Sequence, residues 1–114
     1  MTFTVEIIAK QTIKPSSPTP DNFRTLKLSL LDQFVPAVHV PLVLFYSSNA
    51  DTEENENRLD HLKKSLSEIL TYYYPLAGRI DGNDSISCND EGIDFFKARA
   101  NGHLNELLVG NWLT

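Results

Sequence analysis

The chain has 114 residues, of which 41% are hydrophobic and 22% charged, a balance typical of one modest globular domain rather than of a disordered segment. Its formal net charge of −5, from 15 acids against 10 bases, argues against a surface for nucleic acid or an anionic membrane, because such surfaces need clustered Lys and Arg. One cysteine, Cys88, excludes an internal disulfide and favours a reducing, cytoplasmic compartment.

No stretch of the sequence has the pattern of a targeting or membrane-spanning segment. Residues 1–10 lack the basic leader and continuous apolar stretch of a signal peptide, and the longest apolar run, 40–46, is too short to span a bilayer. We therefore expect no membrane association.

The apolar patterns of the N-terminal half predict three strands. Residues 3–13 place one apolar face toward a core, and the proline-rich stretch 15–20 follows as an exposed, extended connection. Residues 26–30 alternate again and predict a second strand. The stretch 38–46 is apolar at nearly every position, which predicts a third strand covered on both faces, with Pro41 marking an edge or a bulge.

The middle of the chain predicts a long amphipathic helix. Apolar residues recur at spacings of three and four over 55–73, with Asp51 and Asn55 as possible N-caps. Pro75 ends the helix and favours an extended Tyr74.

Beyond the helix, the pattern returns to short strands. Residues 85–88 and 93–97 are strand candidates, and Asn89-Asp90-Glu91-Gly92 has the composition of a hairpin loop between them. Residues 101–108 indicate the start of a further helix. The mixture of strands and helices predicts an α/β fold.

The residues alone do not assemble a catalytic or metal site. His39, His61 and His103 lie far apart in sequence, and no Cys or His partner stands at metal-ligand spacing. Cys88 shares a strand pattern with Ile86 and is interpreted as packing rather than as a nucleophile. Asp90, Glu91 and Asp94 could suggest general acid–base chemistry, but turn chemistry explains them.

Four stretches in one order give a more specific signal. They are 28–33 (LSLLDQ), 40–46 (VPLVLFY), 62–79 ending in YPLAGR, and 88–95 (CNDEGIDF). Together they make residues 3–108 resemble the N-terminal part of the BAHD family of acyl-CoA-dependent acyltransferases, with the vinorine synthase-like and acylsugar-type enzymes as the nearest subgroup.

The resemblance implies a fold and a reaction. Residues 1–114 would be part of a chloramphenicol-acetyltransferase-like α/β domain, a mixed sheet with packed helices, and 109–114 a non-homologous tail. Members of the family transfer an acyl group from an acyl-CoA co-substrate to an alcohol or amine of a plant specialised metabolite, without a bound cofactor. A histidine in an H-x-x-x-D motif acts as the general base, and a D-F-G-W-G motif is structural.

The chain departs from that pattern because none of its histidines is followed by aspartate four residues later, and D-F-G-W-G is absent. We therefore expect a truncated chain with no catalytic residue that is inactive alone. A truncated gene model, an alternative transcript and a pseudogene product all remain open, as do the alternatives of a non-catalytic binding fragment and of an incomplete product without function. Self-association through the apolar stretch is expected.

The resemblance also suggests binding residues. The family places the segment that contains Asp32, Val38, His39 and Pro41 near its substrate channel, so these four are candidates for the pocket of the small-molecule acceptor. The alternative for His39 is an ordinary packing role. The identities of the acceptor and the acyl donor cannot be inferred from the sequence.

Overall fold

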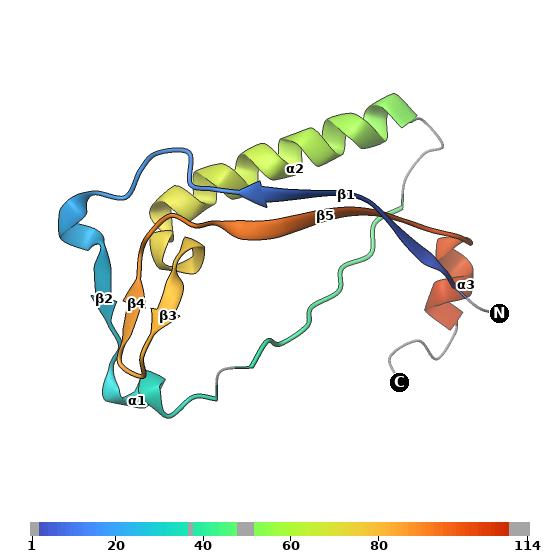
Figure 1. Cartoon of the computed structure of the whole chain (residues 1–114). Coiled ribbons are helices and arrows are strands. Elements are labelled where there is room, and N and C mark those ends of the chain that lie inside the picture. The colour runs from blue at the N-terminus through green and yellow to red at the C-terminus, as the bar shows by residue number, and fades with distance from the viewer. Residues whose placement is uncertain (1–2, 37, 48–51, 110–114) are drawn as a thin grey trace. The chain divides into compact units, whose positions relative to one another are not determined.

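The computed structural model describes residues 3–36, 38–47 and 52–109 (Figure 1). In chain order the elements are β1 (Val5–Ile13), the 3₁₀ turn η1 (Asp21–Phe23), β2 (Thr25–Lys27), α1 (Leu30–Gln33), α2 (Thr52–Tyr72), the 3₁₀ turn η2 (Tyr74–Ala77), β3 (Arg79–Asp81), β4 (Ser85–Ser87), β5 (Ile93–Ala100) and α3 (Leu104–Val109). They fall into two units. Thr12–Ile93 forms the larger, and the described residues of Met1–Gln11 and Asp94–Thr114 form the smaller.

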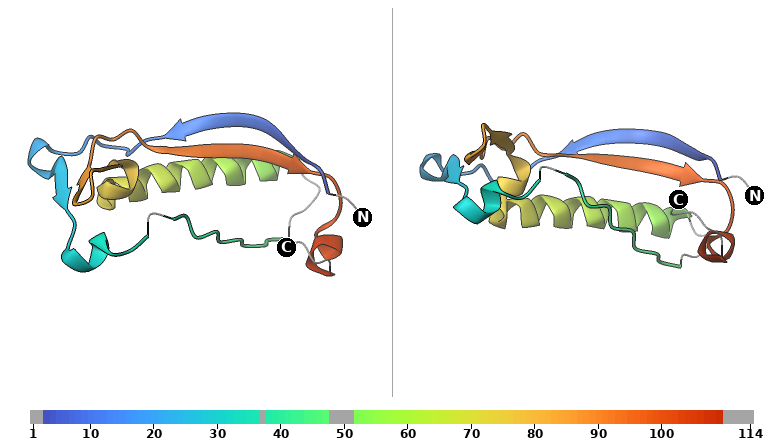
Figure 2. Two further views of the ribbon diagram at one scale, coloured as in Figure 1. Left: turned by 60° about the horizontal axis from the view of Figure 1, so that its bottom comes forward. Right: turned by 90° about the horizontal axis from the view of Figure 1, so that it is seen from below.

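The smaller unit contains most of the two-stranded ribbon of β1 and β5, which lie side by side in every view (Figures 1 and 2). Lys10 bridges to Asp94 at 3.9 Å and lies 5.6 Å from the centroid of the Phe96 ring. The predicted first strand is confirmed, but its predicted buried face is wrong for most of its length. Along β1 only Ile13 is buried, because each strand of a two-stranded ribbon has only one neighbour and no second layer within its unit.

The larger unit contains a small antiparallel sheet in the order β2-β4-β3. Leu26, Ile86 and Ile80 stand opposite one another across its three strands. The predicted hairpin between 85–88 and 93–97 is therefore wrong, because β4 pairs with β3 through a tight turn and β5 pairs with β1. That tight turn contains Gly82 at φ +66°, a conformation that glycine adopts without steric cost.

The long helix α2 is confirmed with shifted ends. It begins at Thr52, so Asn55 lies inside it and does not cap it, and Asp51 lies outside the described residues. It ends at Tyr72, and Pro75 is accommodated in η2. Only Leu70 is fully buried on its apolar side. The final predicted helix is confirmed as α3.

Two expectations for residues 26–47 are wrong. The second strand stops at Lys27, because the Ser29 hydroxyl accepts a hydrogen bond from the Asp32 amide and starts α1. Residues 38–47 form no strand among the described residues and run as an extended trace, as Figures 1 and 2 show. Most of their apolar side chains are exposed rather than covered on both faces, with Phe45 half-buried, and no described strand pairs with them.

The YPLAGR stretch organises the small core of the larger unit. Ala77 and Cys88 are fully buried, and Phe23 stacks on Tyr74 with ring centroids 5.8 Å apart. A Cβ atom on Gly78 would stand 2.2 Å from the Ser87 carbonyl oxygen, so only glycine permits this approach.

The loop 88–92 is held in place from two sides of the core. The Arg79 guanidinium donates to the Gly92 carbonyl at 2.9 Å and pairs with Glu91 at 2.8 Å. The amide of Gly92 donates to the Ala77 carbonyl at 2.9 Å. These bonds fix the start of β3, and therefore the position of Ile80, which lines the cleft described next.

Candidate functional site

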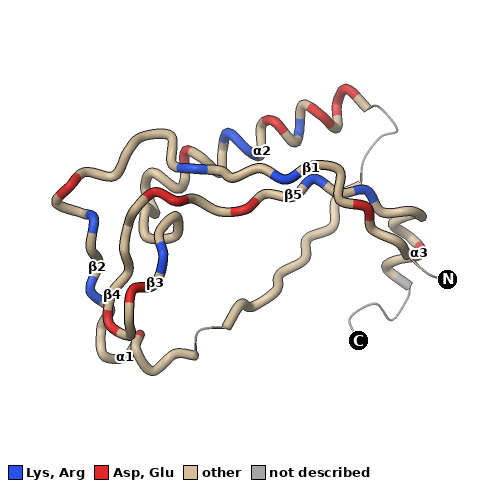
Figure 3. The backbone as a smooth tube through the Cα atoms, in the orientation of Figure 1, with Lys and Arg blue, Asp and Glu red and all other residues tan. Residues whose placement is uncertain are grey.

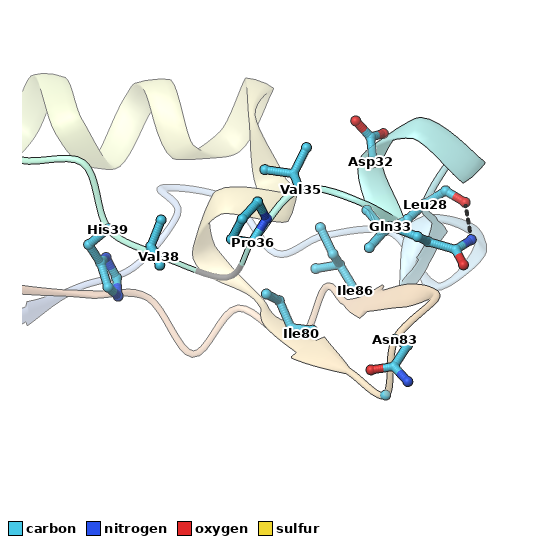
Figure 4. A pocket seen from close by; sticks show the side chains of 11 residues that line it. Leu28, Asp32, Gln33, Val35, Pro36, Val38, His39, Ile80, Asn83 and Ile86 are labelled. Carbon is cyan, nitrogen blue, oxygen red and sulfur yellow. Dashed lines mark hydrogen bonds between the residues drawn. The ribbon is translucent and has the colours of Figure 1, made fainter.

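A cleft of about 530 Å³ opens in the larger unit between α1, the turn after it and the β3–β4 hairpin (Figure 4). The residues that line it are Leu28, Asp32, Gln33, Val35, Pro36, Val38, His39, Ile80, Gly82, Asn83 and Ile86. In Figure 4, Asp32 and His39 lie toward opposite ends, with Val35, Pro36, Ile80 and Ile86 between them. The cleft is thus apolar in the middle and polar at its ends.

Short local structures position the cleft residues. Asp32 lies in the first turn of α1, whose start Ser29 caps through a 3.1 Å bond to the Asp32 amide. Gln33 is tied by its side-chain nitrogen to the Leu28 carbonyl at 3.2 Å (Figure 4). Ile80 and Ile86 are cross-strand partners, so the sheet itself aligns their side chains on one face.

Three of the four predicted pocket residues line this one cleft. Asp32, Val38 and His39 do so, and Pro41 does not. Pro41 lies farther along the exposed segment. Their role toward an acceptor stays a prediction. Sequence reasoning missed the other wall, Ile80, Asn83 and Ile86, for which the available signal was the Gly82-Asn83-Asp84 turn between two short strands.

A second set of polar groups forms a junction between the segment around η1 and the loop after β4. Thr19 is buried, and its amide and hydroxyl donate to the Asp90 carboxylate at 2.8 and 2.5 Å. Arg24 lies 3.5 Å from the same carboxylate. Asp90 adopts a left-handed conformation at φ 57°, which aims its side chain back at Thr19. The prediction that 15–20 is exposed is therefore wrong at Thr19.

The junction sets two pKa values in opposite directions. Burial acts to raise the pKa of Asp90, but the two hydrogen bonds from Thr19 and the charge of Arg24 outweigh it and hold the pKa below its ordinary value. Burial, followed by the negative charge of Asp90, raises the pKa of the Cys88 thiol. A buried thiol with a raised pKa is a poor nucleophile, in agreement with its interpretation as packing.

A shallower groove of about 450 Å³ runs along α2 and is lined by Glu54, Asn57, Arg58, His61, Leu62 and Ser65. Arg58 pairs with Glu54 at 3.1 Å one turn away, and its guanidinium also donates to the Ser47 carbonyl at 3.4 Å. We therefore interpret the groove as part of the solvent-exposed, polar face of α2. His61 is exposed there.

Neither hollow holds a recognisable metal centre. Within residues 3–36, 38–47 and 52–109 there is no group of three or more His, Cys, Asp and Glu that could hold a metal ion. In the same residues no helix is long and apolar enough to cross a membrane. The cleft offers one imidazole, one carboxylate and two side-chain amides, which can bind a polar group of a ligand.

The fold and cleft together define the class of protein as part of a chloramphenicol-acetyltransferase-like α/β domain. Superposition supports this, because the crystal structure of vinorine synthase matches with a TM-score of 0.79 at 42% sequence identity, over 91% of this chain and 26% of that one. The model of the Transferase family matches residues 3–111, and the chain belongs to this family, the BAHD acyltransferases. The predicted family and fold class are confirmed.

Several plant enzymes are similar over the same stretch. Akuammiline synthase 2 of Alstonia scholaris is 46% identical over 104 residues, which are 91% of this chain and 23% of that enzyme. Salutaridinol 7-O-acetyltransferase of Papaver somniferum is 42% identical over 109 residues, with 91% and 23% covered. Vinorine synthase of Rauvolfia serpentina is 42% identical over 105 residues, with 91% and 25% covered. The chain thus spans about a quarter of the length of these relatives.

Proposed function

We propose that this chain supplies the N-terminal portion, including one wall of the acceptor pocket, of an enzyme that transfers an acyl group from an acyl-CoA thioester to an alcohol or amine of a plant specialised metabolite. The observation that carries the proposal is the cleft, in which Asp32, Val38 and His39 meet the apolar residues of the β3–β4 hairpin. Family membership and the names of relatives such as salutaridinol 7-O-acetyltransferase support acyl transfer.

The chemistry assigned to the chain is binding, not proton transfer. Mostly apolar walls with a few polar groups are what a small-molecule pocket requires. The motif of the general base, H-x-x-x-D, does not occur among residues 1–114. Because a general base contributes roughly 10²- to 10⁴-fold to the rate, the isolated chain is expected to show no acyl transfer. A thiol-release assay with acyl-CoA and several acceptors, against a heat-killed control, tests this expectation.

A chimera tests the proposed role itself. Residues 3–108 replace the matching segment of Rauvolfia serpentina vinorine synthase, and acceptor-dependent CoA release is measured. We expect release above that of a control chimera in which the host's motif histidine is alanine. A chimera that folds by circular dichroism and elutes as a monomer, yet releases no CoA with any acceptor, would show that this segment does not serve as the acyltransferase wall.

We also propose that the 114-residue chain self-associates when it is alone. The exposed apolar stretch, residues 38–47, carries no Lys, Arg, Asp or Glu (Figure 3), and Val40 and Leu42 are 85% and 83% exposed. It pairs with no strand among the described residues. Extended apolar segments without a partner strand template association with other chains. The net charge of −5 opposes association only weakly, because salt screens it beyond about 8 Å.

Size-exclusion chromatography with light scattering tests self-association. Leu42→Lys is expected to return the chain toward the monomer. Tyr72→Lys is the matched control, because Tyr72 is 79% exposed, lies on α2 and receives the same added charge. A monodisperse parent chain with a sharp melt contradicts the proposal and favours the alternative of a self-sufficient, non-catalytic binding module.

A further inference from the structure

Two hydroxyl residues in the connection between β1 and η1 each stand directly before a proline. They are Ser17-Pro18 and Thr19-Pro20, and no other Ser-Pro or Thr-Pro pair occurs in the sequence. Thr19 is 5% exposed, and its hydroxyl donates to the Asp90 carboxylate at 2.5 Å. Ser17 is exposed, and within the described residues only its amide is bonded, to the Thr71 hydroxyl at 3.3 Å. The Ser17 hydroxyl is therefore accessible to an enzyme, whereas that of Thr19 is not.

We propose that Ser17 is a phosphorylation site for a proline-directed protein kinase, with ATP as the phosphoryl donor. A kinase of this class selects proline after its target because proline has no N–H, whereas any other residue would bring a donor to a site without an acceptor. Residues 14–20 form no helix or strand, so the segment can enter a kinase cleft without the loss of a ladder or a helical turn.

The transfer itself needs only the serine hydroxyl and the kinase with its bound ATP. The Ser17 Oγ atom forms a bond to the γ-phosphorus of ATP, and the bond from that phosphorus to the bridging oxygen breaks. ADP leaves, and the catalytic aspartate of the kinase accepts the hydroxyl proton.

The added phosphate would lie beside the C-terminal end of α2, next to which the connection runs (Figure 1). The Ser16 amide donates to the Ser67 carbonyl at 3.0 Å, and the hydroxyls of Ser16 and Thr71 are 2.8 Å apart. Together with the bond from the Ser17 amide, these contacts attach the connection to the last two turns of the helix.

A phosphate at this position weakens that attachment. It carries about −1.5 to −2 charges at neutral pH, and the free carbonyls at the end of a helix repel negative charge. The last turn of α2 contains no basic residue, and Lys63 lies two turns before Thr71, about 12 Å along the axis. Phosphorylation of Ser17 should therefore release residues 14–19 from α2.

A kinase assay on the folded chain tests the site. The intact 114-residue chain is incubated with ATP and a purified proline-directed kinase of the mitogen-activated class, and tandem mass spectrometry locates the phosphate. A synthetic peptide of residues 12–23 is the unfolded reference. We expect the ratio of phosphate on Ser17 to phosphate on Thr19 to be about tenfold or more higher in the chain than in the peptide, because Thr19 must first break its bond to a carboxylate.

Two variants assign the reaction to this pair of residues. Pro18→Ala keeps the Ser17 hydroxyl and is expected to lose the phosphate, and circular dichroism compares its folded content with that of the parent. Ser17→Ala is expected to take up no phosphate in the segment 14–20. The absence of phosphate on Ser17, a ratio equal to that of the peptide, or a Pro18→Ala chain that reacts as well as the parent would each overturn the site.

Amide hydrogen exchange tests the release from α2. In the phosphorylated chain the Ser16 amide should exchange at least about threefold faster, which is the scale of an unfavourable charge at a helix end. The control is the Leu28 amide, which donates to the Asp84 carbonyl at 2.7 Å and should keep its rate. A Ser16 amide that exchanges at the same rate or more slowly would overturn the predicted release.

Discussion

Replacing Thr19 by valine removes one hydroxyl from the buried junction while nearly preserving the side-chain shape. The lost contact is the 2.5 Å bond to Asp90, whose side chain is only 17% exposed. Hydrogen bonds to charged groups contribute about 1.5–3 kcal/mol to stability. The Thr19 amide and Arg24 still contact the carboxylate, so we expect a loss near the lower end, about 1.5–2 kcal/mol.

Urea unfolding of parent and variant, followed by far-UV circular dichroism at the lowest workable concentration, measures this loss. Thr19→Ser is the control, because serine keeps the hydroxyl and lacks only a methyl group. A Thr19→Val free energy of unfolding equal to that of the parent would refute the importance of the bond. A serine variant as unstable as the valine variant would assign the effect to packing instead.

The same pair of proteins carries a pH signature. The pKa of Asp90 is lowered in the folded state, so the stability that it contributes is present above the ordinary carboxyl value of about 4 and is lost as pH falls through the lowered pKa. Thr19→Val removes part of the cause of that lowering. The difference in unfolding free energy between parent and variant should therefore be largest near neutral pH and shrink toward about pH 3. A difference independent of pH would contradict the account.

Three further outcomes are expected. Gly78→Ala should lower the free energy of unfolding by about 1–3 kcal/mol or prevent folding, because its Cβ would stand 2.2 Å from a backbone oxygen. Gly82→Ala, whose Cβ would be 3.7 Å from the nearest atom, should lose only the roughly 1–2 kcal/mol of a left-handed backbone. Urea unfolding compares the two variants, and equal losses would contradict the steric reason. Cys88 should resist iodoacetamide in buffer and react in urea, as mass spectrometry would reveal; rapid native labelling would contradict its burial. In the chimera, His39→Ala should raise the acceptor KM more than the acyl-CoA KM, with His61→Ala as the control on α2; unchanged kinetics would remove His39 from the pocket.

The periodicity of apolar residues predicted helices well, because the hydrogen bonds of a helix join residues that are close in sequence. The spacing of apolar residues in α2 predicted its existence and its end near Pro75, because helical hydrogen bonds connect residues four positions apart. The start was misplaced by three residues, since the N-terminal turn depends on a few polar side chains that several positions could supply. Ser29 illustrates the same point, because its capping of α1 cut short a strand that alternation alone would extend to Leu30.

Partners of strands were predicted less well. The turn chemistry of Asn89-Asp90-Glu91-Gly92 was recognised, yet the loop joins two different sheets rather than two strands of one hairpin. Composition predicts where a chain turns, but pairing is decided by contacts that are distant in sequence, such as those that Thr19 and Arg79 make with this loop. For the cleft, one wall was predicted through a resemblance, while the opposite wall, Ile80 and Ile86, required knowledge of the sheet register.

Residues 38–47 show most clearly what an apolar pattern does and does not predict. A segment that is apolar at nearly every position favours burial of the side chains on both of its faces. Among the described residues, however, Val40, Leu42 and Tyr46 are largely exposed. The pattern predicts that these side chains favour burial, but it does not identify the segment that packs against them. In relatives of which this chain matches about a quarter, the remaining length is available to provide cover, and a second copy is available to the isolated chain. If the Leu42→Lys chain is monomeric while the chimera that carries unaltered Leu42 is also monomeric and active, cover by the host and cover by a second copy are alternatives that use the same surface.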